Sequence, residues 1–408
     1  MHVLCVTDYL NNVGGAELSA QTIIDGLVNS PIISQVTVIG ADFNNYEQLD
    51  FGGANVVPVK MPAKFDNVPD LVADAVIASR LSHRITAIKD DVDIVHAHHR
   101  RAAHAVSQAS PAVPTIQTVR DYWPICPISI YSVGSDRCEG CDDCLDECLT
   151  YQEWDGVLEP FHRRYLLTKR KQNRKRTTFD CHVFISNHLQ KVIQLNADLN
   201  GQTTVIYNPV EVDIPNVGKR DKKRFVTASR LSAVKGIDTV VRAIALVQEC
   251  HPNATLDIYG NGPEEDTLRN LARDLGVSTE VTFHGRQSAS EVYQSMATAT
   301  ATIFPSKWEE PFGRITVESM KLGTPVIGSD TGGIGELITP ERTGLLFPPD
   351  DHQSLAAEIR RVIEDSELAL QIEREGRVFS REFSKNQITS DYISLYRNLL
   401  EQSTIGDP

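Results

Sequence analysis

Two glutamates lie eight positions apart around a Pro-Phe-Gly turn, in the segment Ser306-Lys-Trp-Glu-Glu-Pro-Phe-Gly-Arg-Ile-Thr-Val-Glu318. An apolar run precedes the segment, so the pattern predicts a strand, a loop holding Glu310, and a helix that begins at Gly313 with Glu318 in its second turn. A helix N-terminus offers N–H groups and a positive dipole end to a phosphate. Carboxylates on either side accept hydrogen bonds from sugar hydroxyls. The segment therefore predicts a site for a sugar carrying phosphate, against the alternative of two surface glutamates beside a turn.

An arginine and a lysine lie upstream in another loop between a predicted strand and a predicted helix. In Ser229-Arg-Leu-Ser-Ala-Val-Lys-Gly236, Arg230 follows the strand and Lys235 precedes the helix. A leaving diphosphate needs its charge neutralised, and Arg230 and Lys235 suit that role. An arginine and a lysine in a loop are otherwise commonly solvated.

The elements that must position these residues alternate along the whole chain. Short apolar runs separated by amphipathic stretches predict parallel sheets covered by helices on both faces. The alternation restarts after Asn208, which predicts an α/β fold of two doubly wound Rossmann-like domains facing a cleft, with ligands at the carboxyl ends of the strands. We assign 1–208 to an N-terminal acceptor-side domain with an insertion at 124–160, 209–383 to a C-terminal donor domain, and 384–408 to a helix packing back on the N-terminal domain. The predicted strands are 2–7, 35–39, 55–59, 93–98, 115–119, 181–186, 224–229, 255–259, 281–284, 301–304 and 325–328.

On these motifs the chain resembles the retaining glycosyltransferases of family 4, which have the GT-B architecture and carry two glutamates with seven residues between them. The resemblance implies that Glu310 contacts hydroxyls of the donor sugar and Glu318 the ribose of the nucleotide. It also implies that backbone amides around Phe312 and Gly313 face the sugar and phosphates. Arg230 and Lys235 would then bind the diphosphate, and the base would lie near Gly285 and Arg286.

A pair of glycines, Gly14 and Gly15, follows the first predicted strand and opens a helix. Adjacent glycines allow a ligand to approach the backbone closely, and the helix dipole favours negative charge. In the resembled family this loop closes over the donor phosphates or the acceptor.

The chain departs from the resembled family at one position. Many members have histidine in a pattern like His-Asp-Tyr-Trp followed by Cys-Pro, whereas this chain reads Arg120-Asp-Tyr-Trp-Pro-Ile-Cys-Pro. Arginine does not accept a proton near neutral pH, so Arg120 would bind the sugar or an anionic acceptor instead. We place Arg120, Asp121, His98 and His99 on the acceptor side. The alternative for the histidines is a polar strand end, and a metal pair is disfavoured because no carboxylate partner is evident.

Together these features predict transfer of a sugar from a UDP- or GDP-sugar to a hydroxyl acceptor, a glycan or lipid-linked glycan, with retention and without a metal or other cofactor at the donor site. The alternatives are a nucleotide-sugar epimerase or phosphorylase of the same fold, or a catalytically impaired protein that binds sugar nucleotides.

Two other motifs are discounted. Asp91 and Asp93 match the Asp-x-Asp of metal-dependent transferases, but they precede a strand and so lie at the wrong end of the sheet. Gly260 and Gly262 are more typical of a tight loop than of a dinucleotide site.

The charge and hydropathy of the chain limit the classes of binding partner and the location that we expect. The net charge of −14 argues against nucleic acid, and the absence of an apolar run of membrane-spanning length or of a secretory leader predicts a cytoplasmic protein. One segment, 162–176, carries eight Lys or Arg and no acid. With Tyr165, Leu166 and Leu167 as its apolar face, it predicts peripheral docking on anionic lipid, unless it is a solvated helix face.

Four closely spaced cysteines stand in the predicted insertion. Spacings of two, two and three residues suit one zinc ion or an iron–sulfur cluster of structural role, with disulfides or free thiols as the alternative. Cys126 would complete a set of four ligands if one of the four cysteines bound a second cluster instead. The four are Cys138, Cys141, Cys144 and Cys148.

Overall fold

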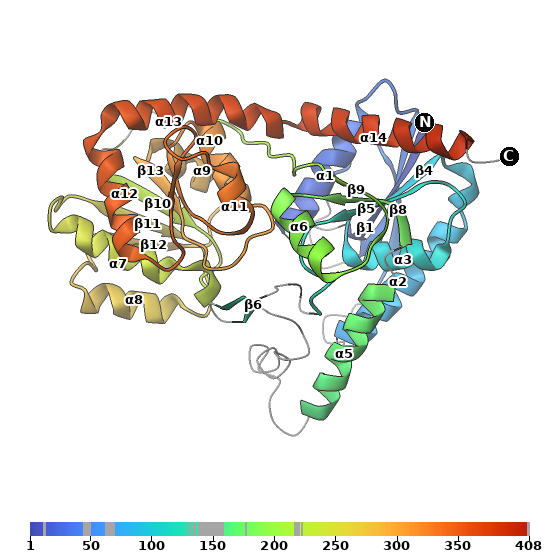
Figure 1. The fold of residues 1–408 in the computed structure, drawn as a ribbon, viewed down its shortest axis with the longest axis horizontal. Coiled ribbons are helices and arrows are strands. Elements are labelled where there is room, and N and C mark those ends of the chain that lie inside the picture. The colour runs from blue at the N-terminus through green and yellow to red at the C-terminus, as the bar shows by residue number, and fades with distance from the viewer. Residues whose placement is uncertain are drawn as a thin grey trace. The chain divides into compact units, whose positions relative to one another are not determined.

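The chain divides into two compact units, which we describe separately. Unit 1 comprises Met1–Val133, Arg137–Pro209 and Lys385–Pro408, and unit 2 is built around Val210–Ser384. The computed structural model is drawn in Figure 1. It describes residues 1–10, 14–43, 50–61, 70–127, 129, 132–133, 136–137, 159–175, 178–215, 221 and 223–405.

Unit 1 contains a seven-stranded sheet in the order β3-β2-β1-β4-β5-β8-β9, and every neighbouring pair is parallel. The central strands are buried along nearly their whole length, as expected for strands covered on both faces. The strands are β1 (His2–Tyr9), β2 (Gln35–Asp42), β3 (Asn55–Lys60), β4 (Ile94–Ala97), β5 (Thr115–Val119), β8 (Thr178–Phe184) and β9 (Asn200–Val205).

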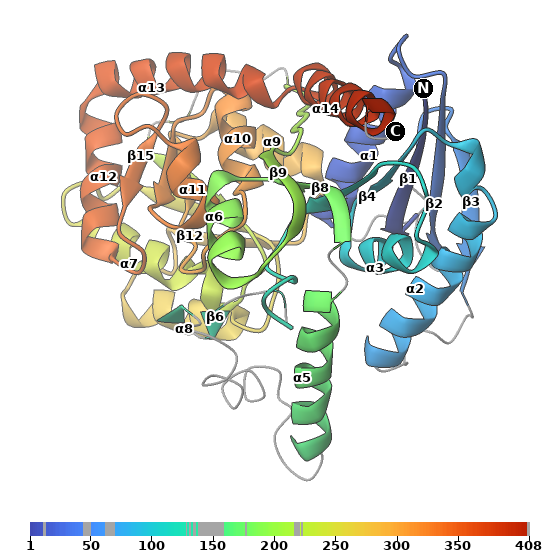
Figure 2. The ribbon, with the colours of Figure 1, turned by 45° about the vertical axis from the view of Figure 1, so that its right-hand side comes forward.

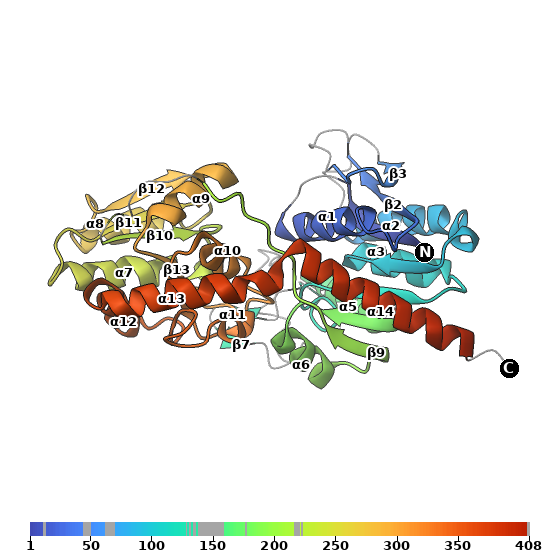
Figure 3. The same cartoon turned by 90° about the horizontal axis from the view of Figure 1, so that it is seen from above.

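Helices cover both faces of this sheet. On one face Ile23 of α1 and Ile388 of α14 share an apolar cluster with β1 residues, and α14 runs beside α1 (Figure 3). On the other face Ile77 of α2 and Val106 of α3 form a second cluster. The helices are α1 (Gly15–Val28), α2 (Asp70–Thr86), η2 (Lys89–Asp91), α3 (Arg100–Ala109), α5 (Glu159–Lys175), α6 (Asn187–Asn196) and α14 (Lys385–Ile405).

Unit 2 contains a six-stranded parallel sheet in the order β12-β11-β10-β13-β14-β15. The order reverses between β10 and β13, and this is the position at which doubly wound sheets bind ligands. The strands are β10 (Arg224–Ala228), β11 (Thr255–Tyr259), β12 (Val281–Gly285), β13 (Ala301–Phe304), β14 (Val326–Ser329) and β15 (Leu345–Phe347).

The helices of unit 2 also lie on both faces of their sheet. Val240 of α7 and Leu355 of α12 share the larger cluster, whereas Met296 of α9 and Ile334 of α11 pack on the opposite face. The helices are η3 (Ala233–Lys235), α7 (Ile237–Gln248), α8 (Glu265–Asp274), α9 (Ala289–Thr298), α10 (Arg314–Leu322), α11 (Gly332–Leu337), α12 (His352–Glu364), α13 (Ser366–Phe379) and η4 (Ser380–Phe383).

These two sheets confirm the predicted α/β fold of two doubly wound Rossmann-like domains. All the predicted strands are present; 115–119, 255–259 and 301–304 have the predicted bounds, and the ends of the others differ by at most three residues. The short strands β6 (Ser132–Val133) and β7 (Asp136–Arg137) complete the elements of the described chain. Within the described ranges, no helix has the length and apolarity needed to cross a membrane.

Candidate donor and acceptor sites

Three loops at the carboxyl edge of the unit 2 sheet are joined to one another by backbone hydrogen bonds. Ser229 N donates to Tyr259 O at 3.0 Å, Leu231 N to Asn261 O at 3.0 Å, and Gly260 N to Gly285 O at 2.8 Å. The loops after β10, β11 and β12 therefore form one continuous backbone layer, which fixes the positions of the residues that follow each strand.

Gly260 is required for this close packing. Its φ is +121°, and a Cβ there would lie 1.9 Å from the carbonyl oxygen of Ser229. The structure thus confirms that the Gly-x-Gly of residues 260–262 is a tight loop, as predicted, whose glycines let it pack against the loop after β10.

The loop after β13 brings the first glutamate next to the predicted diphosphate lysine. Lys235 Nζ forms an ion pair with Glu310 Oε1, and Ser306 Oγ donates to the same oxygen at 3.1 Å. Glu310 is largely buried, its side chain being 10% exposed, and that of Lys235 is 20% exposed. The ammonium also lies 4.7 Å from the ring centroid of Trp308, which is a cation–π arrangement.

Helix α10 begins at the turn that follows Glu310. Gly313 is its N-cap with φ +90° and, having no side chain, does not cap the first turn. A Cβ at Gly313 would approach Ile334 Cγ1 to 3.0 Å, so a larger residue would be strained both by its backbone angle and by its neighbour. The dipole of α10 therefore points its positive end to the loop that carries Glu310.

Glu318 lies in the second turn of α10, as predicted, and other side chains hold it there. Arg314 Nε donates to Glu318 Oε1 at 2.7 Å, and the Tyr293 hydroxyl donates to it at 3.1 Å. Burial, and then the charge of Glu318, raise the pKa of Tyr293 far above its usual value, so this hydroxyl keeps its proton. The Glu318 carboxylate is consequently oriented by Arg314 and Tyr293.

The remaining predicted donor residues differ in exposure. Arg230 and Arg286, which follow β10 and β12, are both exposed. Gly285 has φ +66° and open space around its Cα. Phe312 is buried, with its ring 5.9 Å from that of Phe383, so only its backbone remains to face a ligand.

In unit 1, Gly14 and Gly15 lie where α1 begins, with Gly14 as its extended N-cap. Nearby, His99 is the N-cap of α3 and is buried. Asp8 N lies 3.4 Å from His99 Nδ1, and His99 Nε2 lies 3.9 Å from Glu17 Oε1. Burial lowers the pKa of His99, although Asp8 and Glu17 partly oppose this, so its ring is neutral near pH 7.

His98 is fully buried, and neither of its ring nitrogens has a hydrogen-bond partner among the described residues. Its ring lies 3.9 Å from that of His96, which is also buried. Burial, then the neighbouring His96 and Arg120, keep the pKa of His98 well below its usual value. His98 is therefore a neutral ring packed beneath the strand end rather than an exposed contact.

Arg120 is buried at the end of β5 and is held from two directions. Its Nε donates to the carbonyl of His98 at 3.2 Å, and its NH1 donates to Asn208 Oδ1. Asp121, the next residue, accepts a hydrogen bond from Trp123 N at 2.7 Å. Burial raises the pKa of Asp121 to about 6. Arg120 is thus a fixed guanidinium, and the carboxyl group of the following residue takes up a proton just below neutral pH.

The predicted metal ligands Cys138, Cys141, Cys144 and Cys148 lie outside the described residues. Within the described residues, no three His, Cys, Asp or Glu side chains converge as a metal site would require. Asp93 Oδ2 accepts a hydrogen bond from His2 N at 2.7 Å, where β1 begins. The structure thus confirms that the Asp-x-Asp motif lies at the amino edge of the sheet.

Sequence reasoning missed several residues of these sites. Ser306 and Trp308 lie within the motif that it singled out, and their place between the strand and Glu310 was the available signal. Tyr293 and Asn208 carried no signal, because each reaches its partner from a different element.

Comparison with known proteins agrees with this description in both units. Residues 211–379 match the family model "Glycosyl transferases group 1", and residues 13–214 match "Glycosyltransferase Family 4". Glycogen synthase of Mycobacterium tuberculosis is 28% identical over 216 residues, which cover 49% of this chain and 50% of that protein. The chain spans about half the length of the curated relatives it matches.

Two solved structures have the same fold over nearly the whole chain. HepE of Anabaena in complex with UDP has a TM-score of 0.70 at 22% identity, covering 98% of this chain and 100% of that one. Sucrose-phosphate synthase of Thermosynechococcus elongatus has a TM-score of 0.72 at 19% identity, with the same coverage. The fold is therefore GT-B. Across both units, the chain is similar in sequence to glycosyltransferases of the family 4 kind.

Proposed function

We propose that this chain transfers a sugar from a UDP- or GDP-sugar to a hydroxyl acceptor with retention of anomeric configuration. The observation that carries the proposal is the pairing of Lys235 with Glu310 beside the N-terminus of α10. It joins a cation, a carboxylate and a helix dipole at the carboxyl edge of one sheet. The proposal is supported by the family 4 similarity and by the complexes of HepE with UDP and with UDP-glucose.

In the proposed reaction, the bond between the anomeric carbon and the terminal diphosphate oxygen breaks while the acceptor oxygen bonds to the same carbon. The departing phosphate takes the acceptor's proton on the face that it leaves, so no enzyme nucleophile is needed. Arg230 and Lys235 neutralise the negative charge that develops on the phosphate, assisted by the dipole of α10. No metal or other cofactor enters these steps.

The two glutamates have separate partners in this proposal. Glu310 accepts hydrogen bonds from hydroxyls of the donor sugar, and Glu318, already oriented by Arg314 and Tyr293, accepts them from the ribose. The backbone of Phe312 and Gly313 faces the sugar and phosphates, and that of Gly285 and Arg286 faces the base.

On the acceptor side we propose Gly14, Gly15, Arg120, Asp121 and His99 as residues near the acceptor or the donor phosphates. His98 supports Arg120 through its carbonyl rather than through its buried ring. Because Arg120 is permanently charged and anchored by Asn208, it favours an acceptor or sugar with hydrogen-bond acceptors facing it.

The test combines a thermal-shift panel of nucleotides and nucleotide sugars with transfer assays on an acceptor panel. A donor should raise the melting temperature by mass action. Nucleoside diphosphate should then be released only when an acceptor is present. Release without an acceptor, or a changed sugar in the nucleotide, would indicate hydrolysis or epimerisation. Donor binding without turnover on any acceptor would indicate a catalytically impaired protein.

We also propose that α5 docks on an anionic membrane surface, and the structure narrows the docking face. Leu166 is 1% exposed and packs within unit 1, and Lys169 lies 3.9 Å from Asp74, so neither is available. Phe161 and Leu167 are 73% and 44% exposed. In Figure 2 the first turns of α5 project away from the sheet of unit 1.

Flotation with liposomes tests the docking proposal. Phe161→Ser should reduce binding to vesicles that contain anionic lipid, and high salt should weaken what remains. Equal binding to neutral and anionic vesicles would contradict it.

A further inference from the structure

In the candidate donor site of unit 2, the charges of a lysine and a glutamate neutralise each other. Lys235, the proposed phosphate ligand, pairs with Glu310, the proposed sugar ligand, and its ammonium also lies over the ring of Trp308. Among the described residues, Glu310 is the one carboxylate paired with Lys235. A donor that uses both side chains must therefore separate them.

Hydrogen bonds hold together the backbone segments that carry Lys235 and Glu310. The two residues must therefore separate by moving their side chains. Lys307 N and Trp308 N both donate to Val234 O, at 2.9 and 3.2 Å, next to Lys235 in the chain. Gly236 packs on the same loop, since a Cβ there would lie 2.1 Å from the Pro305 carbonyl oxygen. The loop after β10 and the loop after β13 thus present Lys235 and Glu310 as one rigid assembly.

We infer that the Lys235–Glu310 ion pair is a clasp that makes this site favour the intact nucleotide sugar over the nucleoside diphosphate that the reaction leaves behind. The inference rests on the proposed function. A diphosphate alone draws Lys235 away from Glu310. The Glu310 side chain, which is 10% exposed, then keeps only the neutral Ser306 hydroxyl as a hydrogen-bond partner among the described residues. Removing one partner of a poorly solvated ion pair is costly.

An intact donor does not leave Glu310 unpaired. Its phosphates bind Lys235 while its sugar hydroxyls donate hydrogen bonds to Glu310. The two ends of the donor therefore bind cooperatively. After transfer the sugar is gone and the clasp closes again, which displaces the diphosphate. The ion pair accordingly weakens binding of the product relative to binding of the substrate.

Neutralising Glu310 should change the two affinities in opposite directions. In Glu310→Gln the ammonium is no longer held by a charge, so UDP should bind about 3- to 10-fold more tightly. UDP-glucose should lose affinity by at least a similar factor, because the amide is a weaker acceptor for its hydroxyls. Tighter binding of one ligand cannot arise from misfolding.

Isothermal titration of the full chain with UDP and UDP-glucose, and with GDP and GDP-mannose, measures these changes. Glu318→Gln is the matched control, since that glutamate pairs with Arg314 rather than Lys235 and its loss should not strengthen UDP binding. Unchanged or weaker binding of the diphosphate to Glu310→Gln would overturn the clasp while leaving the proposed function intact. Failure of the wild type to bind any of the four ligands would overturn the proposed function, and the clasp with it.

Discussion

The imidazole Nδ1 of His96 lies 2.7 Å from the phenol oxygen of Tyr396, although 300 positions separate the two residues in the chain. The other ring nitrogen lies 2.7 Å from Thr118 Oγ1, and all three side chains are buried. Because Tyr396→Phe leaves a buried nitrogen unpaired, we expect the free energy of unfolding to fall by about 1–3 kcal/mol in urea titrations. Ser394→Ala, which removes an exposed hydroxyl from the same helix, should leave it nearly unchanged.

The buried histidines of unit 1 should make stability fall in acid. Burial, as the largest cause, keeps the pKa of His96, His98 and His99 below the usual 6.5. The unfolded chain therefore binds more protons below that pH, and stability is lost as the pH falls through 6.5. Asp121 opposes this, because its folded pKa of about 6 exceeds 3.8 and the folded state binds the extra proton between those values.

Three histidines outweigh one carboxyl group, so the free energy of unfolding should drop between about pH 7.5 and about pH 5.5, each net proton contributing about 1.4 kcal/mol per pH unit. His98→Leu should flatten this dependence by removing one of the titrating rings. A wild-type stability that stays constant over this range would contradict the prediction.

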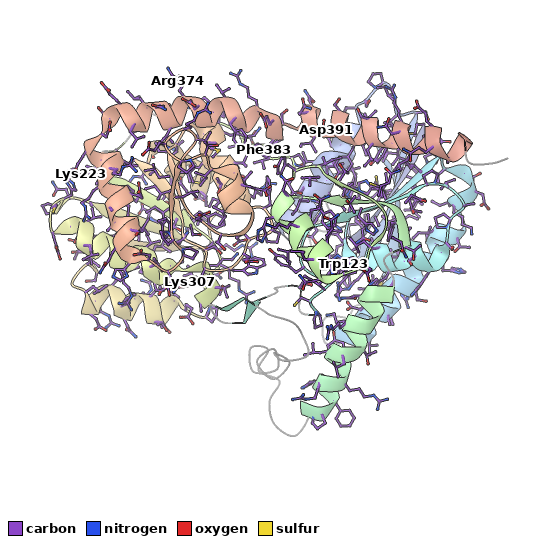
Figure 4. All side chains as sticks on the ribbon, viewed as in Figure 1. Trp123, Lys223, Lys307, Arg374, Phe383 and Asp391 are labelled. Atoms are coloured by element: carbon purple, nitrogen blue, oxygen red, sulfur yellow. The ribbon has the colours of Figure 1, made fainter. Side chains whose placement is uncertain are left out.

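Arg230→Ala should weaken nucleoside diphosphate binding without lowering the melting temperature of the free protein. The side chain is exposed, so its loss removes a charge-assisted contact to phosphate and little packing. We expect a 10-fold or greater rise in Kd, or about 1.5–3 kcal/mol. Arg374→Ala, on the outer face of α13 (Figure 4), is the control, and an equal loss there would indicate a nonspecific charge effect.

Substitution of two apolar residues of α5 should affect the stability of the protein differently. Leu166 is 1% exposed, and the end of the same helix is anchored where Asn173 Nδ2 donates to the carbonyl of Trp123 at 2.6 Å (Figure 4). Leu166→Ala should lower the free energy of unfolding by about 2–5 kcal/mol. Phe161→Ala, at a side chain 73% exposed, should not lower it measurably. Similar losses for both would mean that α5 packs differently.

The cysteine spacing between residues 138 and 148 predicts a structural zinc ion or iron–sulfur cluster, with disulfides or free thiols as the alternative. Protein purified without air should contain about one equivalent of zinc, or iron with sulfide, and chelator should lower its melting temperature. Less than about a tenth of an equivalent, with stability unchanged by chelator, would contradict the prediction.

The sequence predicted best where strands are continuous apolar runs, as in β1 and β13. It missed β9, because Asn200–Val205 reads Asn-Gly-Gln-Thr-Thr-Val and lies at the edge of its sheet, where none of its residues is fully buried. It also missed α12, although Asp351 caps that helix by accepting hydrogen bonds from Gln353 N and Ser354 N. A short polar edge strand and a helix with one buried stripe depend on tertiary packing more than on their own pattern.

The residues of the candidate site could be predicted where they lie together in one short motif. They could not be predicted where a side chain meets its partner from a distant helix, strand or loop. Glu310, Gly313 and Glu318 follow from one segment. Lys235 meets Glu310 across 75 positions because the backbone at Lys307 and Trp308 bonds to Val234, which no local pattern encodes. The Asn208 that anchors Arg120 lies 88 positions downstream.

The return of α14 to unit 1 also sets the order in which the chain folds during synthesis. Both stretches of unit 2, Gly134–Asp136 and Val210–Ser384, precede Lys385–Ile405 in the chain and so are synthesised before it. Until then the nascent sheet of unit 1 lacks Tyr392 and Tyr396, and the apolar face that α14 will cover stays open to water. Unit 1 therefore cannot complete this apolar cluster until α14 has been synthesised, and a chain whose synthesis stopped after unit 2 would expose that face and be prone to aggregate.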